Sequence, residues 1–137
     1  MIRTALALVA LFPSLAAAAT VPAHAKPTPM NYVEFVVHDV ARTRTFYHAV
    51  FGWTFVDYGP GYTSFIDNGL GGGFTTEGTP TTGGPLMVFH VDKLEETLER
   101  AKAAGAVIVK PIFAFPGGHR FHFKDPDGYE IAAWAQE

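Results

Sequence analysis

Two segments of the chain repeat one pattern: a short apolar strand, an Asp, an amphipathic helix and a Gly. The first strand leads to Asp39 and its helix ends before Gly52, while the second leads to Asp92 and its helix ends before Gly105. In both copies the Asp and the Gly are 13 positions apart. An Asp can cap the first turn of a helix, and a Gly can adopt the left-handed conformation that follows the last turn. Matched start and stop signals at equal spacing predict two copies of one structural module.

Each module is predicted to run β-α-β-β-β, because turn signals divide the segment after each helix into three short stretches of β-forming residues. In the second helix, Asp92 and Glu95 form a capping-box pattern. The predicted strands cover 31–37, 53–58, 62–66, 70–75, 85–91, 106–109, 119–124 and 129–135, and the predicted helices cover 40–51 and 93–104.

The predicted fold class is α+β. A module of this size has one apolar sheet face that needs covering, so we expect the two modules to pair their sheets around a shared cleft. Module one is assigned to 30–76, a linker rich in Gly and Thr to 77–84, and module two to 85–137. A chain of 137 residues, 48% hydrophobic, is long enough for one domain with a single core.

Charge and cysteine content narrow the possible functions. The formal net charge is only −3, so neither a nucleic-acid footprint nor a polybasic membrane patch is indicated. The chain has no cysteine. Disulfides, thiol catalysis and cysteine-ligated zinc are therefore excluded.

Residues 1–25 have the pattern of a secretory signal peptide. Arg3 supplies the positive start, an apolar stretch follows, and Ala23-His24-Ala25 is typical of a cleavage site. We expect export, to the periplasm, with a mature chain that begins near Lys26 and an extended lead-in over 26–29. The alternative is a buried N-terminal helix or a membrane anchor.

The duplicated module resembles the vicinal oxygen chelate (VOC) superfamily, which includes glyoxalase I, bleomycin-resistance proteins and extradiol dioxygenases. Three motifs carry the resemblance: Asp39, the Phe46-Tyr47 pair followed by Phe51-Gly52-Trp53, and Asp125-Pro126-Asp127-Gly128-Tyr129. The resemblance covers nearly all of 30–137. It implies the glyoxalase/bleomycin resistance/dioxygenase fold, but one scaffold in this superfamily supports isomerase, lyase, dioxygenase and pure binding functions.

Metal-dependent members of the superfamily place one ligand on the first strand and one on the last strand of each module. Counting from the Asp and the turn motifs, these positions fall on Tyr32, Gly73, Leu86 and Ala132. A divalent site normally uses His, Asp or Glu. The usual tetrad is therefore predicted to be absent, and no cofactor is expected.

Strand alternation selects the polar groups that would line the cleft. Glu34, His90 and Glu130 are expected to converge there, and Glu34 should point between the two modules. Arg120, after a Gly-Gly turn, could bind an anion, with an ion pair to Asp125 or Asp127 as the equal alternative. For Glu34 and His90 a structural hydrogen bond is the competing interpretation. The candidate ligand-binding residues are Tyr32, Glu34, Tyr62, His90, Arg120, His122, Glu130 and Trp134.

The run Gly71-Gly72-Gly73 resembles no phosphate-binding loop, because no Lys-Ser/Thr and no helix follow it. A close approach of another group to the backbone is the favoured explanation.

Three functions remain open. The first is a metal-independent protein that binds a small, aromatic or polyfunctional molecule, as bleomycin-resistance members do. The second is a glyoxalase-like or dioxygenase-like enzyme with an unusual metal site built from Glu34, His90, Glu130 and His122. The third is a structural or interaction module whose cleft is filled by side chains. The first is preferred, with a small-molecule ligand and a second copy of the chain as expected partners, no nucleic acid, and no membrane insertion after processing.

Overall fold

The computed structural model describes residues 29–66 and 70–136. The predicted signal peptide, most of the predicted lead-in, residues 67–69 and residue 137 lie outside this description. The described chain confirms the duplicated β-α-β-β-β order. Module one contains β1 (Tyr32–Val36), α1 (Val40–Phe51), β2 (Phe55–Asp57), β3 (Tyr62–Ile66) and β4 (Gly71–Thr75); module two contains β5 (Met87–His90), α2 (Leu94–Ala103), β6 (Val107–Phe115), β7 (Gly118–Lys124) and β8 (Glu130–Ala135).

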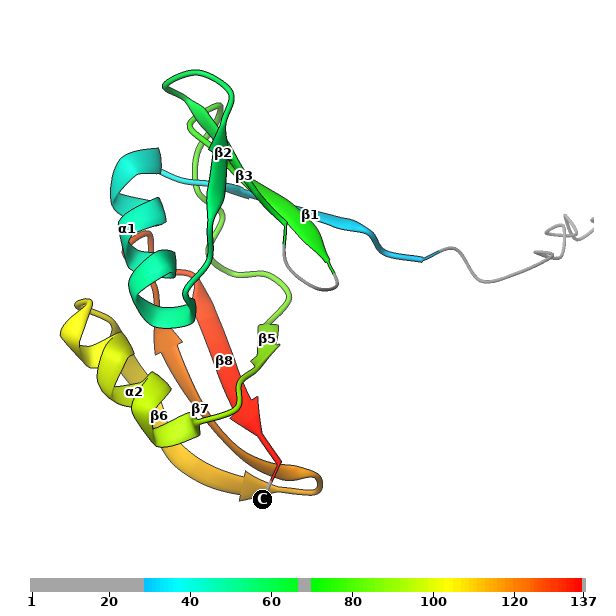
Figure 1. Cartoon of the computed structure of the whole chain (residues 1–137), viewed down its shortest axis with the longest axis vertical. Coiled ribbons are helices and arrows are strands. Elements are labelled where there is room, and N and C mark those ends of the chain that lie inside the picture. The colour runs from blue at the N-terminus through cyan, green and yellow to red at the C-terminus, as the bar shows by residue number, and fades with distance from the viewer. Residues whose placement is uncertain (1–28, 67–69, 137) are drawn as a thin grey trace, which may run out of the picture.

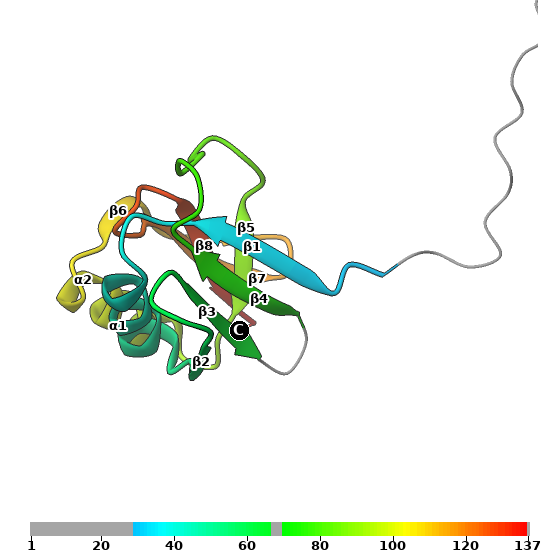
Figure 2. The same cartoon turned by 90° about the horizontal axis from the view of Figure 1, so that it is seen from above.

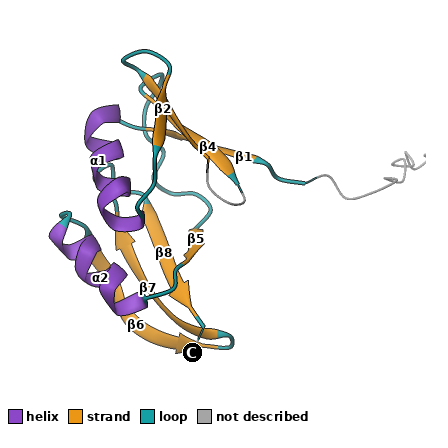
Figure 3. Cartoon of the chain, in the orientation of Figure 1, coloured by secondary structure: helices purple, strands orange, loops and turns teal. Residues whose placement is uncertain are grey.

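Each module forms one four-stranded mixed sheet, in the order β1-β4-β3-β2 and β5-β8-β7-β6. In both sheets the first and last strands of the module pair in parallel, and the remaining pairs are antiparallel. The two helices lie side by side and cover the same side of the sheets (Figures 1 and 2). Figure 3 shows the resulting arrangement, with both helices on one flank and the two sheets splayed apart on the other. The paired-module α+β fold is confirmed.

The capping residues predicted from the sequence are observed for the helix of module one but not at the start of the helix of module two. The Asp39 side chain accepts a hydrogen bond from the Arg42 backbone N–H at 2.9 Å, and Gly52 ends α1 at φ 73°. The predicted Asp92–Glu95 capping box is wrong, because α2 begins one residue later with Lys93 as its N-cap and no side-chain cap. Lys93 instead binds Glu96 in the first turn, at 2.9 Å.

The strand predicted over 106–109 is also wrong in length, since β6 continues to Phe115. The prediction ended this strand two residues before Pro111, whose backbone cannot donate a ladder hydrogen bond. The register of β6 against β7 shifts on both sides of Lys110, and this irregularity accommodates the proline within the strand. The extension places Lys110 opposite His122.

One continuous core joins the modules. Fully buried Tyr47 of α1 stacks on Trp53, with ring centroids 5.1 Å apart, and packs on Phe74 of β4 at 4.9 Å. The same helix reaches the second sheet through Phe46, whose ring lies 6.2 Å from that of Phe123. The helix α1 therefore packs against both sheets.

The turn after β7 anchors the second module to the first. Buried Asp125 accepts a hydrogen bond from the Tyr47 hydroxyl at 2.8 Å. Asp127 accepts from the His38 backbone N–H at 2.8 Å and from Arg42 at 3.1 Å. These contacts hold the start and middle of α1 against a turn more than 70 residues away in the chain.

Within residues 29–66 and 70–136, the structure contains no helix with the length and apolar character needed to cross a membrane.

Candidate functional site

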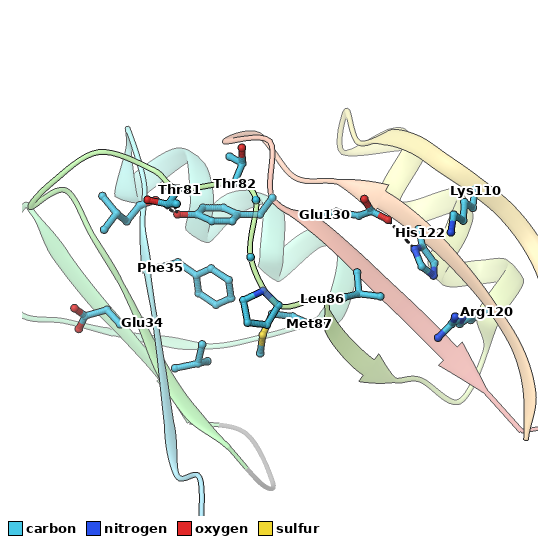
Figure 4. A pocket seen from close by; sticks show the side chains of 16 residues that line it. Glu34, Phe35, Thr81, Thr82, Leu86, Met87, Lys110, Arg120, His122 and Glu130 are labelled. Carbon is cyan, nitrogen blue, oxygen red and sulfur yellow. Dashed lines mark hydrogen bonds and ion pairs between the residues drawn. The ribbon is translucent and has the colours of Figure 1, made fainter. Parts of the chain in front are cut away.

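A cavity of about 680 Å³ lies between the two modules. One wall is β1, the floor is the linker that leads into β5, and the opposite wall is the exposed face of the second sheet (Figure 4). Its lining is apolar at the β1 and linker side and charged at the far side. The apolar part includes Val33, Phe35, Val36, Leu86 and Met87, and the charged part includes Lys110, Arg120, His122 and Glu130.

His122 is the most buried polar side chain of this lining, with only 3% of its surface exposed. Its Nδ1 lies 2.8 Å from Glu130 Oε1. An ionised carboxylate only accepts hydrogen bonds, so Nδ1 donates, and in the neutral form of the ring Nε2 then carries the free lone pair. Nε2 is buried and has no hydrogen-bond partner within residues 29–66 and 70–136. The pair arises because the two residues lie diagonally across β7 and β8, where His122 is opposite Ala132.

Arg120 lies two residues before His122 on the same face of β7. Its guanidinium carbon is 5.1 Å from the ring centroids of both Phe113 and Phe115. The predicted alternative, an ion pair with Asp125 or Asp127, is wrong, because Asp125 binds Tyr47 and Asp127 binds Arg42. Arg120 Nε is buried, and no residue that the structure describes forms a hydrogen bond with it. In the described part of the chain, neither Arg120 nor Lys110 forms a salt bridge.

Tyr32, Tyr62 and Glu34 form a separate group on the exposed face of the first sheet. The two tyrosine hydroxyls are hydrogen-bonded to each other, and that of Tyr62 also donates to Glu34 Oε2 at 3.1 Å. The hydrogen bond to Tyr32, partial desolvation and the bond to Glu34 raise the pKa of Tyr62 well above its usual range. Glu34 contributes to the cavity wall, but Figure 4 shows its carboxylate directed away from Arg120, His122 and Glu130.

The expected convergence of Glu34, His90 and Glu130 is therefore wrong. His90 contacts Trp134, with ring centroids 4.8 Å apart, and it lines a different hollow, between α2 and the end of α1. The structure thus divides the predicted site residues into three groups. Arg120, His122 and Glu130 line the cavity, Tyr32, Tyr62 and Glu34 bind one another on the first sheet, and His90 and Trp134 lie together at the edge of the second.

The residues at the superfamily's metal positions do not fit a metal. A Cβ at Gly73 would lie 2.7 Å from the Tyr32 hydroxyl oxygen and closer still to that of Tyr62. Two phenol groups therefore fill the space in which a ligand side chain at position 73 would extend. Leu86 and Ala132, the corresponding positions of the second module, have no donor atom. Among the residues that the structure describes, no group of three His, Asp or Glu side chains is arranged to hold a metal ion.

Sequence reasoning missed three parts of the cavity. Lys110 was missed because the predicted strand ended at residue 109, and Tyr129 because it was assigned to the last strand and to a superfamily motif but not to the site. The linker was treated as a spacer, although Thr81 to Leu86 lines the cavity. The β-forming composition of Ile112 to Phe115 was the available signal for the longer strand.

Known structures share this fold at low sequence identity. A glyoxalase/bleomycin resistance protein/dioxygenase family enzyme from Burkholderia phytofirmans PsJN is 19% identical with a TM-score of 0.70, over 80% of this chain and 100% of that chain. A glyoxalase-related enzyme from Fulvimarina pelagi is 22% identical with a TM-score of 0.70, over 80% of this chain and 89% of that chain. No curated protein sequence gives a significant match.

The family model of the Glyoxalase/Bleomycin resistance protein/Dioxygenase superfamily matches residues 30–133. This match covers the whole of module one and all but the end of module two. Together with the duplicated β-α-β-β-β order and the two mixed sheets, it identifies the chain as a member of the glyoxalase/bleomycin resistance/dioxygenase (VOC) superfamily.

Proposed function

We propose that the protein binds a small organic molecule in the cavity between its modules, without a metal at the superfamily positions. The observation that carries this proposal is the cavity of about 680 Å³ together with the buried, unpartnered Nε2 of His122 at its charged end. Ligand sites in proteins are typically mostly apolar concavities of this size with a few positioned polar groups. The protein would act outside the cytoplasm, after removal of residues 1–25.

The lining supports a ligand with two unlike parts. Phe35, Leu86 and Met87 offer an apolar surface for a flat or aliphatic body. Arg120, His122 and Glu130 offer hydrogen bonds that would orient the molecule. Of the predicted ligand-binding residues, these three are retained in the proposal, and Tyr32, Glu34, Tyr62, His90 and Trp134 are not.

The enzymatic alternative has less support from the geometry. Its proposed metal site needed Glu34, His90, Glu130 and His122 together, but Glu34 is bound to Tyr62 and His90 lies in another hollow. The His122–Glu130 pair could still act as a proton acceptor, since the carboxylate orients the ring and leaves Nε2 with a lone pair.

A cavity-filling substitution tests the proposal. Leu86 lines the cavity and is 37% exposed, so Leu86→Trp should fill the space with little effect on folding. Nuclear magnetic resonance with a library of small aromatic fragments should show backbone shifts at Phe35, Leu86 and His122 in the wild type. The variant should lose these shifts.

The matched control is Val107→Trp, a similar enlargement at a β6 position that is 64% exposed and lies outside the cavity lining. It should retain fragment binding. Fragments that shift no cavity residue of the wild type, or that bind Leu86→Trp equally well, would contradict the proposed function and favour a filled structural module.

A further inference from the structure

The charged end of the cavity contains more unpaired positive than negative charge. Five titratable side chains line the cavity besides Tyr129: Glu34, Lys110, Arg120, His122 and Glu130. Each of the two carboxylates already has a partner, because Glu130 binds His122 at 2.8 Å and Glu34 accepts from Tyr62 at 3.1 Å. Lys110 and Arg120 have no acidic partner among the described residues.

The Arg120 guanidinium is held by packing and not by an ion pair. Its central carbon lies 5.1 Å from the rings of both Phe113 and Phe115. Aromatic faces attract a guanidinium and fix its plane without using its N–H groups. The fork of donors thus remains free for a planar anion such as a carboxylate.

Two buried nitrogens at this end have no hydrogen-bond partner among the described residues, and both belong to groups suited to an anion or a hydroxyl. These are Arg120 Nε and His122 Nε2. Buried polar atoms in native proteins are normally paired, so each unpaired atom needs an explanation. A bound oxyanion would accept from Arg120, while a neighbouring hydroxyl of the same ligand would donate to His122 Nε2. Both atoms are shielded from solvent, so the side chains must shift slightly to admit these groups.

Figure 4 shows Lys110, His122 and Arg120 arranged along one wall, with the apolar side chains of Leu86, Met87 and, on β1 itself, Phe35 on the side toward β1. We infer that the cavity's ligand is an organic carboxylate with an apolar body, whose anion is held by Arg120 and Lys110 beside His122; this inference rests on the proposed ligand-binding function. The apolar body lies on Phe35, Leu86 and Met87.

A pair of isosteric probes tests the anion subsite. Benzoate and benzamide have the same planar body, but only benzoate carries a charge. Calorimetric titration of the purified protein should give an affinity for benzoate about tenfold or more above that for benzamide, the ratio expected for one charge-assisted hydrogen-bonded contact. Added sodium chloride should weaken benzoate binding and leave benzamide binding nearly unchanged.

Substitutions of single basic residues show which of them causes the preference for benzoate over benzamide. Arg120→Gln should reduce the preference for benzoate to near unity, while Lys124→Gln, which removes the same charge from exposed Lys124 at the far end of β7 and outside the cavity, should preserve it. Lys110→Gln, at an exposed position without a salt-bridge partner among the described residues, should reduce the preference in part. If Arg120→Gln folds poorly, Lys110→Gln still tests whether the basic side chains of the cavity cause the preference.

Equal affinity for the two probes, or a preference that survives both Arg120→Gln and Lys110→Gln, would overturn the inference. So would the absence of any benzoate binding. Neutral fragments that still shift Phe35 and Leu86 would then show that the proposed function holds and only the anion subsite fails. If neutral fragments also fail to bind, both the proposed ligand-binding function and the anion subsite are contradicted.

Discussion

Individual residues have different roles from those that their residue type suggests. Glu34 looked like a cleft carboxylate, but it accepts from Tyr62 on the exposed face of the first sheet. Asp125, part of a turn motif, is 6% exposed and binds the hydroxyl of Tyr47 in the core. The reason is that hydrogen-bond partners come from distant segments: 78 positions separate Asp125 from Tyr47. A side chain's partner, and not its type, determines its role here.

Asp125 allows a prediction at this scale. Its carboxylate accepts from Tyr47 and from the backbone N–H groups of Asp127 and Tyr129, each at 2.8–2.9 Å. Asp125→Ala should lower the free energy of unfolding by about 2–4 kcal/mol, because buried donors lose their acceptor. Asp125→Asn, which retains one oxygen, should cost less. Urea denaturation of the three proteins measures both differences.

Burial raises the pKa of Asp125 despite the hydrogen bond from Tyr47, which lowers it. A raised folded-state pKa means that the stabilising contribution is complete below the unfolded pKa, near 3.9, and is lost as the pH rises through the folded value. The stability advantage of the wild type over Asp125→Asn should therefore shrink as the pH rises from below about 4 through the raised folded-state pKa. An advantage that grows with pH would show that Asp125 is stabilised as a carboxylate.

At the scale of single elements, β4 has a glycine-rich sequence with low strand propensity, and side chains pack closely against its glycines on both faces of the sheet. A Cβ at Gly72 would meet Phe65 Cε1 at 2.8 Å and the Val33 carbonyl oxygen at 2.7 Å, and one at Gly73 would meet the tyrosine pair. The expected close approach to the glycine run is confirmed on both faces. Glycine lowers strand propensity, but here it admits Phe65 to the core and the phenols to the surface.

Gly72→Ala should therefore destabilise the fold by about 1–3 kcal/mol through overpacking against Phe65 and the backbone of β1. Gly83→Ala is the control, because nothing lies within 4 Å of a Cβ there and φ is not in the left-handed region. That change should be neutral or slightly stabilising. Thermal melts of both variants measure the effect, and equal melting temperatures would show that β4 has room for a side chain.

At the scale of the whole molecule, three long-range contacts hold the modules together within the chain. Asp127 binds the start of α1, Asp125 binds its middle, and the Tyr129 hydroxyl donates to the Val36 carbonyl oxygen at 2.8 Å. All three come from the turn 125–129, the segment that also carries a superfamily motif. By holding this turn against α1 and β1, these contacts set the separation of the two cavity walls.

The fold is compatible with the proposed export. Within the described residues, the first strand begins at Tyr32, so cleavage after Ala25 would leave β1 and every later helix and strand intact. Expression with the leader in a Gram-negative host should give periplasmic protein whose N-terminus, by mass spectrometry, lies near Lys26. A purified protein that retains Met1 would contradict the signal-peptide interpretation.

Local sequence determined the elements of this protein, because periodicity, caps and turns act over a few residues. The equal Asp-to-Gly spacing predicted both helices, and α1 occurs over the predicted residues 40–51. The sequence also predicted Tyr32, Gly73, Leu86 and Ala132 at the metal positions that the resemblance implies. Only the tertiary structure decided which polar groups meet. In the folded chain Glu34 accepts a hydrogen bond from Tyr62, and His90 lines a different hollow from Glu130. The irregular register of β6 near Pro111 places Lys110 opposite His122. Such meetings depend on register and on the angle between sheets, to which residues far apart in the chain contribute together.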